Sequence, residues 1–371
     1  MNVRHAHAGK ELDGLGEECL AVRYEYSQLV EFATELGHKA GLPRDRAEVQ
    51  AGVLLEADLM GHTTHGLNLL PGFLKELESG ALAKTGDPTV ISDKQSAVLW
   101  DGNRLPGTWL LTRAIAEARE RIKTSPIVSV VIRRSGHIAA LSSYLRQATE
   151  RGLMILLAAT NPAMRTVVPA GGIEPMLAPN PIAFGFPTDE DPILIDISTS
   201  AVANGWVRRW TKEGKRLPQK WLQDSNGNLT DNPAALFGPP PGALLPLGGV
   251  ELGHKGFALG LIVEALTGGL SGVGHTGKPK DAGNLVYFQL VDPNAFAGAA
   301  EFKHDSTGLA QACRASKPRE GVKSVRMPGD GALALCRSQL HDGVELYPSI
   351  MPDLQPWAAK LGVTAPRALS E

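Results

Sequence analysis

Cysteine is scarce in this sequence: the 371 residues include three, Cys19, Cys313 and Cys336. Three scattered cysteines exclude a disulfide framework and a zinc knuckle, and they favour a reduced, cytoplasmic compartment. No apolar run reaches the ~18 residues that a membrane-spanning helix needs. Residues 1–18 also lack the apolar stretch of a signal peptide. We therefore expect a cytoplasmic protein that does not enter a membrane.

An excess of basic charge is also lacking. Lysine and arginine number 37, and aspartate and glutamate number 39, which leaves a formal net charge of −2. A nucleic-acid partner is excluded on this ground, because such a surface needs a basic patch and no basic block stands out. Hydrophobic residues make up 43% and charged residues 20%, as in folded globular chains. At roughly 150 residues per domain, the length predicts two domains.

Several familiar site motifs are missing or misplaced. The sequence contains neither a P-loop nor a G-x-S-x-G segment. Residues 272–277 match G-x-G-x-x-G, but a dinucleotide fingerprint follows a strand, whereas an apolar helix is predicted here. His62 and His65 are three residues apart, yet neither an H-E-x-x-H pattern nor a third nearby ligand accompanies them. We therefore expect no metal site.

Hydrophobic periodicity divides the chain into helical and strand-like parts. Apolar residues spaced three and four apart predict helices, which dominate the start of the chain. Helices and apolar runs of strand length then alternate, which predicts an α/β sheet core. The expected helices are 26–41, 43–60, 67–80, 111–122, 141–148 and 256–270. The expected strands are 127–132, 154–159, 182–186, 193–197 and 285–291, and residues 211–250 are expected to be mostly loop.

Three polar segments interrupt these apolar elements and carry ionisable groups. His65 follows the second helix, His137 follows the strand at 127–132, and Asp196 ends the strand at 193–197. Ligands gather outside the carboxyl ends of strands in α/β sheets, and a carboxylate beside an imidazole fixes its tautomer. A catalytic acid–base pair is one interpretation. The other is that the histidines are solvated or capping residues in turns and that Asp196 caps a helix.

Seven segments, taken in order, resemble one protein family. They are THGL (64–67), SGHIAALSSY (135–144), NPIAFGFPT (180–188), IDISTSAVANG (195–205), LPLGG (245–249), GHKGFALGLIVEALTGGLSG (253–272) and RMPGDG (326–331). The ordered set is similar to the malate/L-lactate dehydrogenase family that lacks a Rossmann fold. Other members of that family are sulfolactate, ureidoglycolate, 2,3-diketogulonate and Δ1-piperideine-2-carboxylate oxidoreductases.

The resemblance implies a fold, a cofactor and a reaction. The fold would be α/β: a non-Rossmann central lobe with a large mixed sheet flanked by helices, plus a helical lobe from the N- and C-terminal regions. The reaction would be hydride transfer between NADH or NADPH and a small 2-oxo acid. In such relatives the histidine of the T-H-G segment donates the proton, which assigns His65 here. Asp196 would orient this imidazole, and His137 would be a pocket residue.

The same resemblance assigns cofactor-binding residues and a partner. We expect His254 and Lys255 to lie at the start of a helix, where anions bind favourably. Relatives form homodimers, so a homodimer is expected, while the choice between NADH and NADPH stays open. The assigned cofactor-binding residues are Ile195, Asp196, Ile197, Ser198, His254, Lys255, Gly329, Asp330 and Gly331.

Two positions depart from the family pattern. Leu69 stands where relatives commonly have an arginine suited to a substrate carboxylate, and Pro179 stands where they have a threonine. A hydrogen bond to a charged group contributes about 1.5–3 kcal/mol, so a carboxylate substrate needs another partner. We hypothesise that Arg165 supplies it; the alternative is a solvated loop arginine. The predicted substrate-site residues are Thr64, Leu69, Arg165 and Pro179.

The leading prediction is a NAD(P)H-dependent reductase of a small 2-oxo acid. One alternative is a reductase of the same fold that acts on a cyclic imine, and another is a non-catalytic nucleotide-binding relative. For the domains we expect a mobile tail at 1–23 and a mainly helical domain made of 24–120 together with 295–371. Residues 121–294 would form the nucleotide-binding α/β domain.

Overall fold

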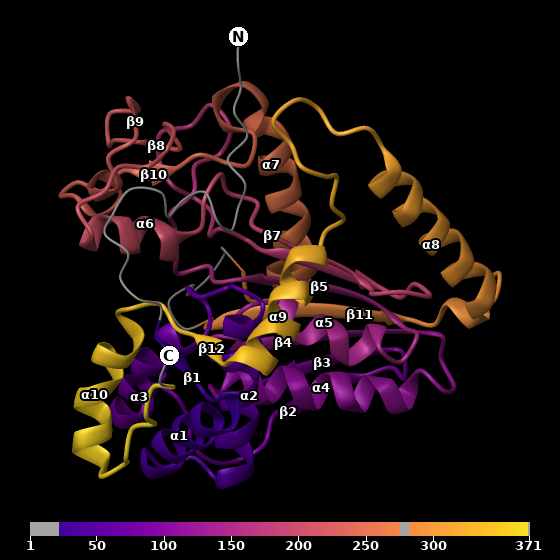
Figure 1. The fold of residues 1–371 in the computed structure, drawn as a ribbon, viewed down its shortest axis with the longest axis horizontal. Coiled ribbons are helices and arrows are strands. Elements are labelled where there is room, and N and C mark those ends of the chain that lie inside the picture. Colours follow the sequence, from indigo (N-terminus) through magenta and orange to yellow (C-terminus); the bar gives the residue numbers. More distant parts are fainter. Residues whose placement is uncertain (1–21, 275–281, 370–371) are drawn as a thin grey trace.

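The structure is a computed structural model that describes residues 22–274 and 282–369. Its centre is a seven-stranded sheet with the strand order β2-β3-β4-β11-β5-β6-β7 (Figure 1). Strands β3 and β4 are parallel and the other neighbours are antiparallel, so the expected mixed sheet is confirmed. The bounds are β2 Thr89–Asp93, β3 Ala97–Asp101, β4 Ile127–Ser135, β5 Met154–Thr160, β6 Ile182–Phe186, β7 Ile193–Ile197 and β11 Asn284–Val291.

The middle of this sheet is buried on both faces. Strand β11 reads LVYFQLV from residue 285, a nearly continuous apolar run, as expected of a strand covered on both sides. Val286, Phe288 and Leu290 on one face are fully buried, and so is Leu285 on the other face. Strand β7 lies at the edge of the sheet, because it pairs with β6 alone within the sheet.

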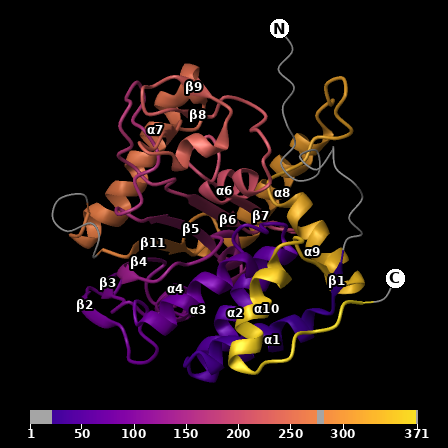
Figure 2. The ribbon, with the colours of Figure 1, turned by 90° about the vertical axis from the view of Figure 1, so that its left-hand side faces the viewer.

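Helices from both ends of the chain cover one face of the sheet (Figure 2). Helices α4 and α5 pack directly on the strands, and α2 packs beneath them. Their apolar stripes and the sheet share one continuous core, here called the main core, which includes Leu29, Leu74 and Leu354. The helices of this layer are α1 Tyr26–Lys39, α2 Arg44–Leu59, α3 Leu70–Ser79, α4 Gly107–Arg121, α5 Ser142–Thr149, α9 Asp330–Asp342 and α10 Ile350–Leu361.

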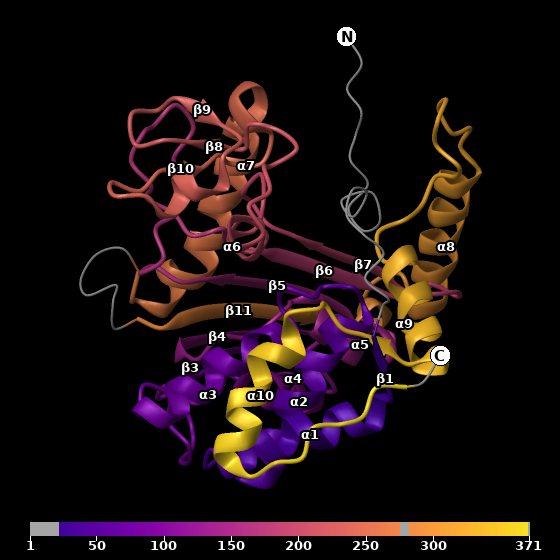
Figure 3. The ribbon, with the colours of Figure 1, turned by 60° about the vertical axis from the view of Figure 1, so that its left-hand side comes forward.

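A second group of elements stands on the opposite face and is here called the upper lobe (Figure 3). Helix α7 (Gly249–Glu264) runs into a π-helical turn, Ala265–Gly269, which packs on β5 and β11. Helix α6 (Asn204–Lys212) and a small sheet of β8 (Leu222–Gln223), β9 (Leu229–Thr230) and β10 (Ala243–Leu244) complete the lobe. Helix α8 (Ala299–Ala315) rises at the other end of the sheet.

Most expected elements are confirmed, and β6 and β7 have the expected bounds. Strands β2 and β3 and helix α6 were not predicted. Because β2 and β3 join the large sheet, residues 24–120 supply strands as well as helices. Arg23 and Tyr24 form β1, paired with β12 (Val344–Glu345). Residues 1–21 of the predicted tail, with Cys19, lie outside the described residues, as do residues 275–277 of the glycine motif. No described helix is long and apolar enough to span a membrane.

Candidate functional site

His65 lies in a turn between α2 and the short helix Leu67–Leu69 that leads into α3. The buried carboxylate of Asp58, in the last turn of α2, accepts the N–H of Leu67 at 2.7 Å. A Cβ atom on Gly66 would lie 2.3 Å from this carboxylate, so only glycine lets the chain pass here. The hydrogen bond from Leu67 to the end of α2 and the close approach of Gly66 together fix the position of the turn that carries His65.

The imidazole of His65 faces a second imidazole. Its Nδ1 atom lies 2.8 Å from the hydroxyl of Thr64, which is buried. The ring of His137 stacks on it, with ring centroids 6.2 Å apart and planes inclined by 28°. Phe73 meets the His137 ring edge-on at 6.2 Å. The structure therefore brings together two histidines that are 72 positions apart in the sequence.

His137 is held in one tautomer by the turn that follows β4. The backbone N–H of Ala139 donates to its Nδ1 atom at 3.0 Å. Because a backbone N–H can only donate, this nitrogen carries no proton, and the neutral ring is protonated at Nε2. Space beside the neighbouring Gly136 is tight, since a Cβ atom there would lie 2.6 Å from a methyl group of Leu82 and 3.0 Å from the Leu105 carbonyl oxygen.

Asp196 joins β7 to the start of α5 and acts on His65 through its charge. Its carboxylate accepts the N–H of Ser142, the first residue of α5, at 2.8 Å. This geometry satisfies one of the unpaired N–H groups at a helix N-terminus, as in the capping interpretation, although the helix is remote in sequence. The negative charge of Asp196 also raises the pKa of His65. The hydrogen bond agrees with the capping interpretation, and the acid–base pair stays a prediction.

Burial dominates the protonation of the site. Burial and, to a smaller extent, the neighbouring His137 together lower the pKa of His65 to about 4, against the opposing effect of Asp196. Burial alone lowers the pKa of His137 to about 4. Burial raises the pKa of Asp58 to about 7, although the Leu67 N–H and Arg209 oppose this shift. Both imidazoles are consequently neutral at pH 7 in the unliganded site.

Arg209 is a site residue that the sequence analysis missed. It comes from α6, and its Nη1 and Nη2 atoms donate to the hydroxyl (2.9 Å) and carbonyl (3.2 Å) of Thr63. Its guanidinium lies 3.5 Å from the ring centroid of Tyr347, and 7% of the residue is exposed. Asp58 was missed as well, although it is a charged residue on the inward stripe of α2, and that pattern could have drawn attention to it.

The segment at 178–181 is attached to the end of β7. The carbonyl of Pro179 accepts from the Ser198 hydroxyl at 3.1 Å and from the Thr199 N–H at 3.0 Å. The buried amide of Asn180 accepts from the Thr160 hydroxyl at 2.7 Å. Leu69 is half-buried and packs against the main core.

Three of the predicted residues are exposed at the surface. Arg165 is exposed on the loop that follows β5. His254 and Lys255 are exposed on α7, and the expectation that they lie at a helix start is wrong. The helix begins at Gly249, because Gly248, with φ 95°, starts it earlier than the apolar run suggests. The two residues are therefore inside the helix, where their own N–H groups are no longer free to bind an anion.

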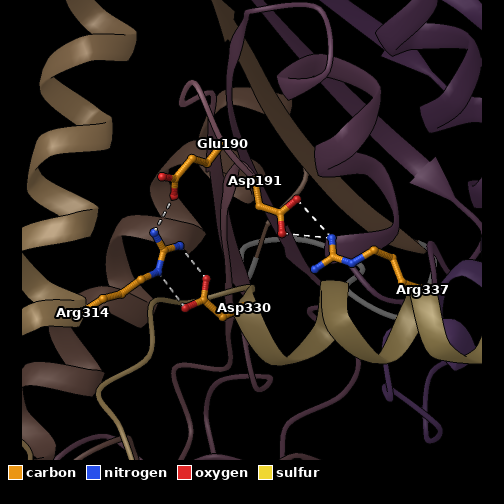
Figure 4. Close-up of a pocket in the computed structure, with 5 residues that line it drawn as sticks. All are labelled: Glu190, Asp191, Arg314, Asp330 and Arg337. Atoms are coloured by element: carbon orange, nitrogen blue, oxygen red, sulfur yellow. Dashed lines mark hydrogen bonds and ion pairs between the residues drawn. The ribbon is translucent and has the colours of Figure 1, made fainter.

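A charged hollow of about 510 Å³ lies beside the turn at 326–331 (Figure 4). Arg314 pairs with Asp330 at 2.7 Å and with Glu190 at 3.2 Å. Across the hollow, Arg337 pairs with Asp191 at 2.9 Å. Three carboxylates thus face two guanidinium groups, which leaves no positive excess for a phosphate.

The turn that carries Gly329, Asp330 and Gly331 is anchored to β7. The N–H of Leu194 donates to the carbonyl of Pro328 at 3.2 Å. Gly329 has φ 97°, and a Cβ atom on it would lie 3.0 Å from the Leu194 nitrogen. This close approach brings the turn next to the strand that carries Asp196. Among the described residues, no three His, Cys, Asp or Glu side chains form a group that could hold a metal ion.

Comparison with known proteins gives matches along most of the chain. The family model for malate/L-lactate dehydrogenase matches residues 24–355. The malate dehydrogenase of Pyrococcus horikoshii is 31% identical over 351 residues, which cover 92% of this chain and 96% of that protein. The L-lactate dehydrogenase of Cupriavidus necator is 31% identical over 336 residues, covering 88% and 94%. The solved structure of a Δ1-piperideine-2-carboxylate reductase from Pseudomonas syringae matches with a TM-score of 0.78 and 29% identity, covering 91% and 99%.

Proposed function

Because the chain belongs to the malate/L-lactate dehydrogenase family, we propose that it transfers hydride between a nicotinamide cofactor and a small 2-oxo acid, with His65 as the proton-transfer residue. The observation that carries this proposal is the meeting of His65 with His137 and the charge of Asp196. A half-buried imidazole under the influence of a carboxylate is suited to general acid–base catalysis at a carbonyl oxygen.

The outer edge of β7 fits a nicotinamide cofactor. The N–H of Leu194 points outward to Pro328, and alternate residues of a strand point their N–H groups the same way. The backbone of Asp196 therefore faces this edge, where it can pair with a carboxamide. Ile197 is 40% exposed and offers apolar surface for a ring. When bound, the reduced cofactor supplies the hydride.

The remaining cofactor contacts are proposed from position and charge. Ile195 and Ser198 flank Asp196 and Ile197 in the chain. Lys255 and His254 would reach a phosphate through their side chains alone, since the helix start lies further back. The turn at 329–331 would contact the cofactor beside β7, where Asp330 already pairs with Arg314. The proposal includes both NADH and NADPH as the cofactor.

His65 would move the proton. With a pKa of about 4, roughly one imidazole in a thousand is protonated at pH 7, so the free site is prepared to accept a proton from an alcohol. In the reducing direction the protonated ring donates to the oxygen that gains negative charge. A bound carboxylate substrate raises the pKa of His65, because an opposite charge nearby favours the imidazolium. Asp196 supports the same change.

The proposal is tested by following the nicotinamide absorbance with NADH and with NADPH. The substrate panel contains pyruvate, oxaloacetate, a phenyl-substituted 2-oxo acid and Δ1-piperideine-2-carboxylate. For the best pair, His65→Ala should lower kcat by at least ~100-fold, the usual contribution of a general acid. His62→Ala, in the same turn, is the matched control and should retain most of the activity. Full turnover by His65→Ala would disprove the assigned role.

Reduction of a cyclic imine is the second candidate. It is favoured by the likeness to the Pseudomonas syringae reductase and by the apolar Leu69, which suits a less polar substrate. The same substrate panel distinguishes the two reactions, because a cyclic-imine reductase would prefer Δ1-piperideine-2-carboxylate over every 2-oxo acid. Cofactor binding without turnover on any substrate would instead indicate a non-catalytic nucleotide-binding relative.

Arg165 remains the proposed partner of the substrate carboxylate, beside Thr64 and Pro179 in the substrate site. It is exposed on the loop after β5, so a bound anion would have to draw it inward. Arg165→Ala should raise KM for the best acid by about tenfold or more, the cost of one charge-assisted hydrogen bond. An unchanged KM would leave Arg165 as a solvated loop residue.

A homodimer is proposed from the surface of α7. This helix and its flanks expose apolar side chains on one side of the upper lobe, and a second copy of the chain would cover them. Light scattering should give twice the chain mass, and Leu261→Glu should shift it to the monomer. Leu229→Glu, on β9, is the control. The exposed residues are Val250, Leu252, Leu261, Ile262 and Leu270, each between 48% and 65% exposed.

A further inference from the structure

The turn that carries His65 is held at both ends by buried charged side chains. At its end, the carboxylate of Asp58 accepts the N–H of Leu67 at 2.7 Å. At its start, Arg209 donates to the hydroxyl and the carbonyl of Thr63 at 2.9 and 3.2 Å. His65 lies between these two attachments. The position of its imidazole therefore depends on both.

The two attachments come from different parts of the molecule. Asp58 belongs to α2 and the main core, whereas Arg209 belongs to α6 of the upper lobe. Helix α6 is itself fastened to the C-terminal segment, because Arg209 lies over the ring of Tyr347 and Glu213 accepts from the Tyr347 hydroxyl. Arg209 thus connects the upper lobe, the His65 turn and the C-terminal segment at one point.

We propose that Arg209 is a positioning residue for His65: it holds Thr63 from α6 and thereby fixes the imidazole between the upper lobe and the helical layer. This inference rests on the proposed function, in which His65 transfers the proton. The charge of Arg209 also acts on the ring. Four groups influence the ionisation of His65: His137, His62 and Arg209 disfavour the imidazolium, and Asp196 favours it.

Three variants of the full chain test this role. Arg209→Gln removes the charge and the paired donors, so kcat should fall about tenfold to a hundredfold, as for a misplaced catalytic group, with a smaller change in KM. Loss of the positive charge should also raise the pKa of His65. Arg209→Lys keeps the charge and should leave that pKa near the wild-type value while recovering part of kcat. Arg208→Gln, the exposed neighbour on α6, is the matched control and should match wild type.

A second variant keeps the test valid if Arg209→Gln does not fold. Thr63→Val removes the hydroxyl that Arg209 reaches and should lower kcat in the same direction but less. The ionisation of His65 is followed independently of activity by NMR titration of its ring C–H signal, assigned with His65→Ala. Unchanged kcat and an unchanged His65 titration in Arg209→Gln and Thr63→Val would overturn the inference.

The two proposals fail in different ways. If His65→Ala is fully active, the proposed function fails, and the NMR titration still shows whether Arg209 acts on His65. If His65→Ala is inactive while both variants at the Arg209–Thr63 contact behave as wild type, the proposed function stands and the positioning role is disproved.

Discussion

The helical layer and the upper lobe lie on opposite faces of one sheet and are packed very differently. The helical layer shares the large main core, in which Leu29, Leu74 and Tyr144 are fully buried. The upper lobe has a small separate core around Leu222 and Leu244, and α7 exposes much of its apolar surface. His65 follows a helix of the first region, while Arg209, from the second, holds Thr63 in the same turn. Residues in a well-packed region open rarely, so the more mobile side of the site should be the side of Arg209.

The largest expected effect is the loss of unfolding free energy when a leucine is removed from the main core, compared with the same change in the small core of the upper lobe. Leu74→Ala, in α3, should cost toward 5 kcal/mol of unfolding free energy, because the surrounding main core cannot collapse around the cavity. Leu222→Ala, in β8, removes an equally buried side chain but should cost nearer to about 2 kcal/mol, since the small core can adjust. Urea unfolding of both variants measures this difference. Equal losses would mean that the two regions are packed alike.

A smaller effect concerns the charge that is buried in the helical layer. The pKa of Asp58 is raised to about 7, above its unfolded value, so the folded state binds the additional proton. The stability that this group contributes is complete below about pH 4 and is lost as pH rises through 7. Asp58→Asn keeps an acceptor for the Leu67 N–H and avoids this loss.

Relative to wild type, Asp58→Asn should therefore gain stability on the order of 4 kcal/mol between pH 4 and pH 8. Unfolding in urea at several pH values measures the gain. Asp45→Asn, at an exposed position at the start of the same helix, is the matched control. If the difference in unfolding free energy between Asp58→Asn and wild type does not change with pH, the pKa of Asp58 is not raised as expected.

The smallest effect is expected on the surface, outside both cores. Arg337 and Asp191 form an ion pair at 2.9 Å, with 60% and 42% of their side chains exposed. Exposed pairs contribute about 0.2–1 kcal/mol and are screened by salt. Arg337→Gln should thus change the unfolding free energy by less than about 1 kcal/mol, and less still in 1 M salt. A larger loss would show that the hollow in Figure 4 has a structural role.

Sequence patterns predicted the helical layer better than the upper lobe, for physical reasons. Helices α1 and α2 have buried apolar stripes, and β6 and β7 are short apolar runs between turns, so periodicity located them. Helix α6 is short and rich in arginine and tryptophan, and it lies in loop-rich surroundings. Strand β2 is mostly exposed, so no apolar alternation marked it.

Sequence analysis predicted only those site residues that stand out as polar, ionisable side chains between apolar elements. His65, His137 and Asp196 stand in polar breaks between apolar elements, and the fold brings them together. The role of Asp58 depends on a backbone N–H nine residues away, and that of Arg209 on Thr63, 146 residues away. Such partners follow from the tertiary structure, and no spacing in the chain reveals them.

The central claim is that His65 transfers the proton, and the pH dependence of both reaction directions tests it most directly. With wild-type protein and the best substrate pair, kcat/KM for reduction should rise about tenfold per unit as pH falls from 8 to 5, because only the protonated ring donates. For oxidation, kcat/KM should be constant above about pH 5, since the neutral ring accepts the proton. A reduction rate that is independent of pH over this range would contradict the account.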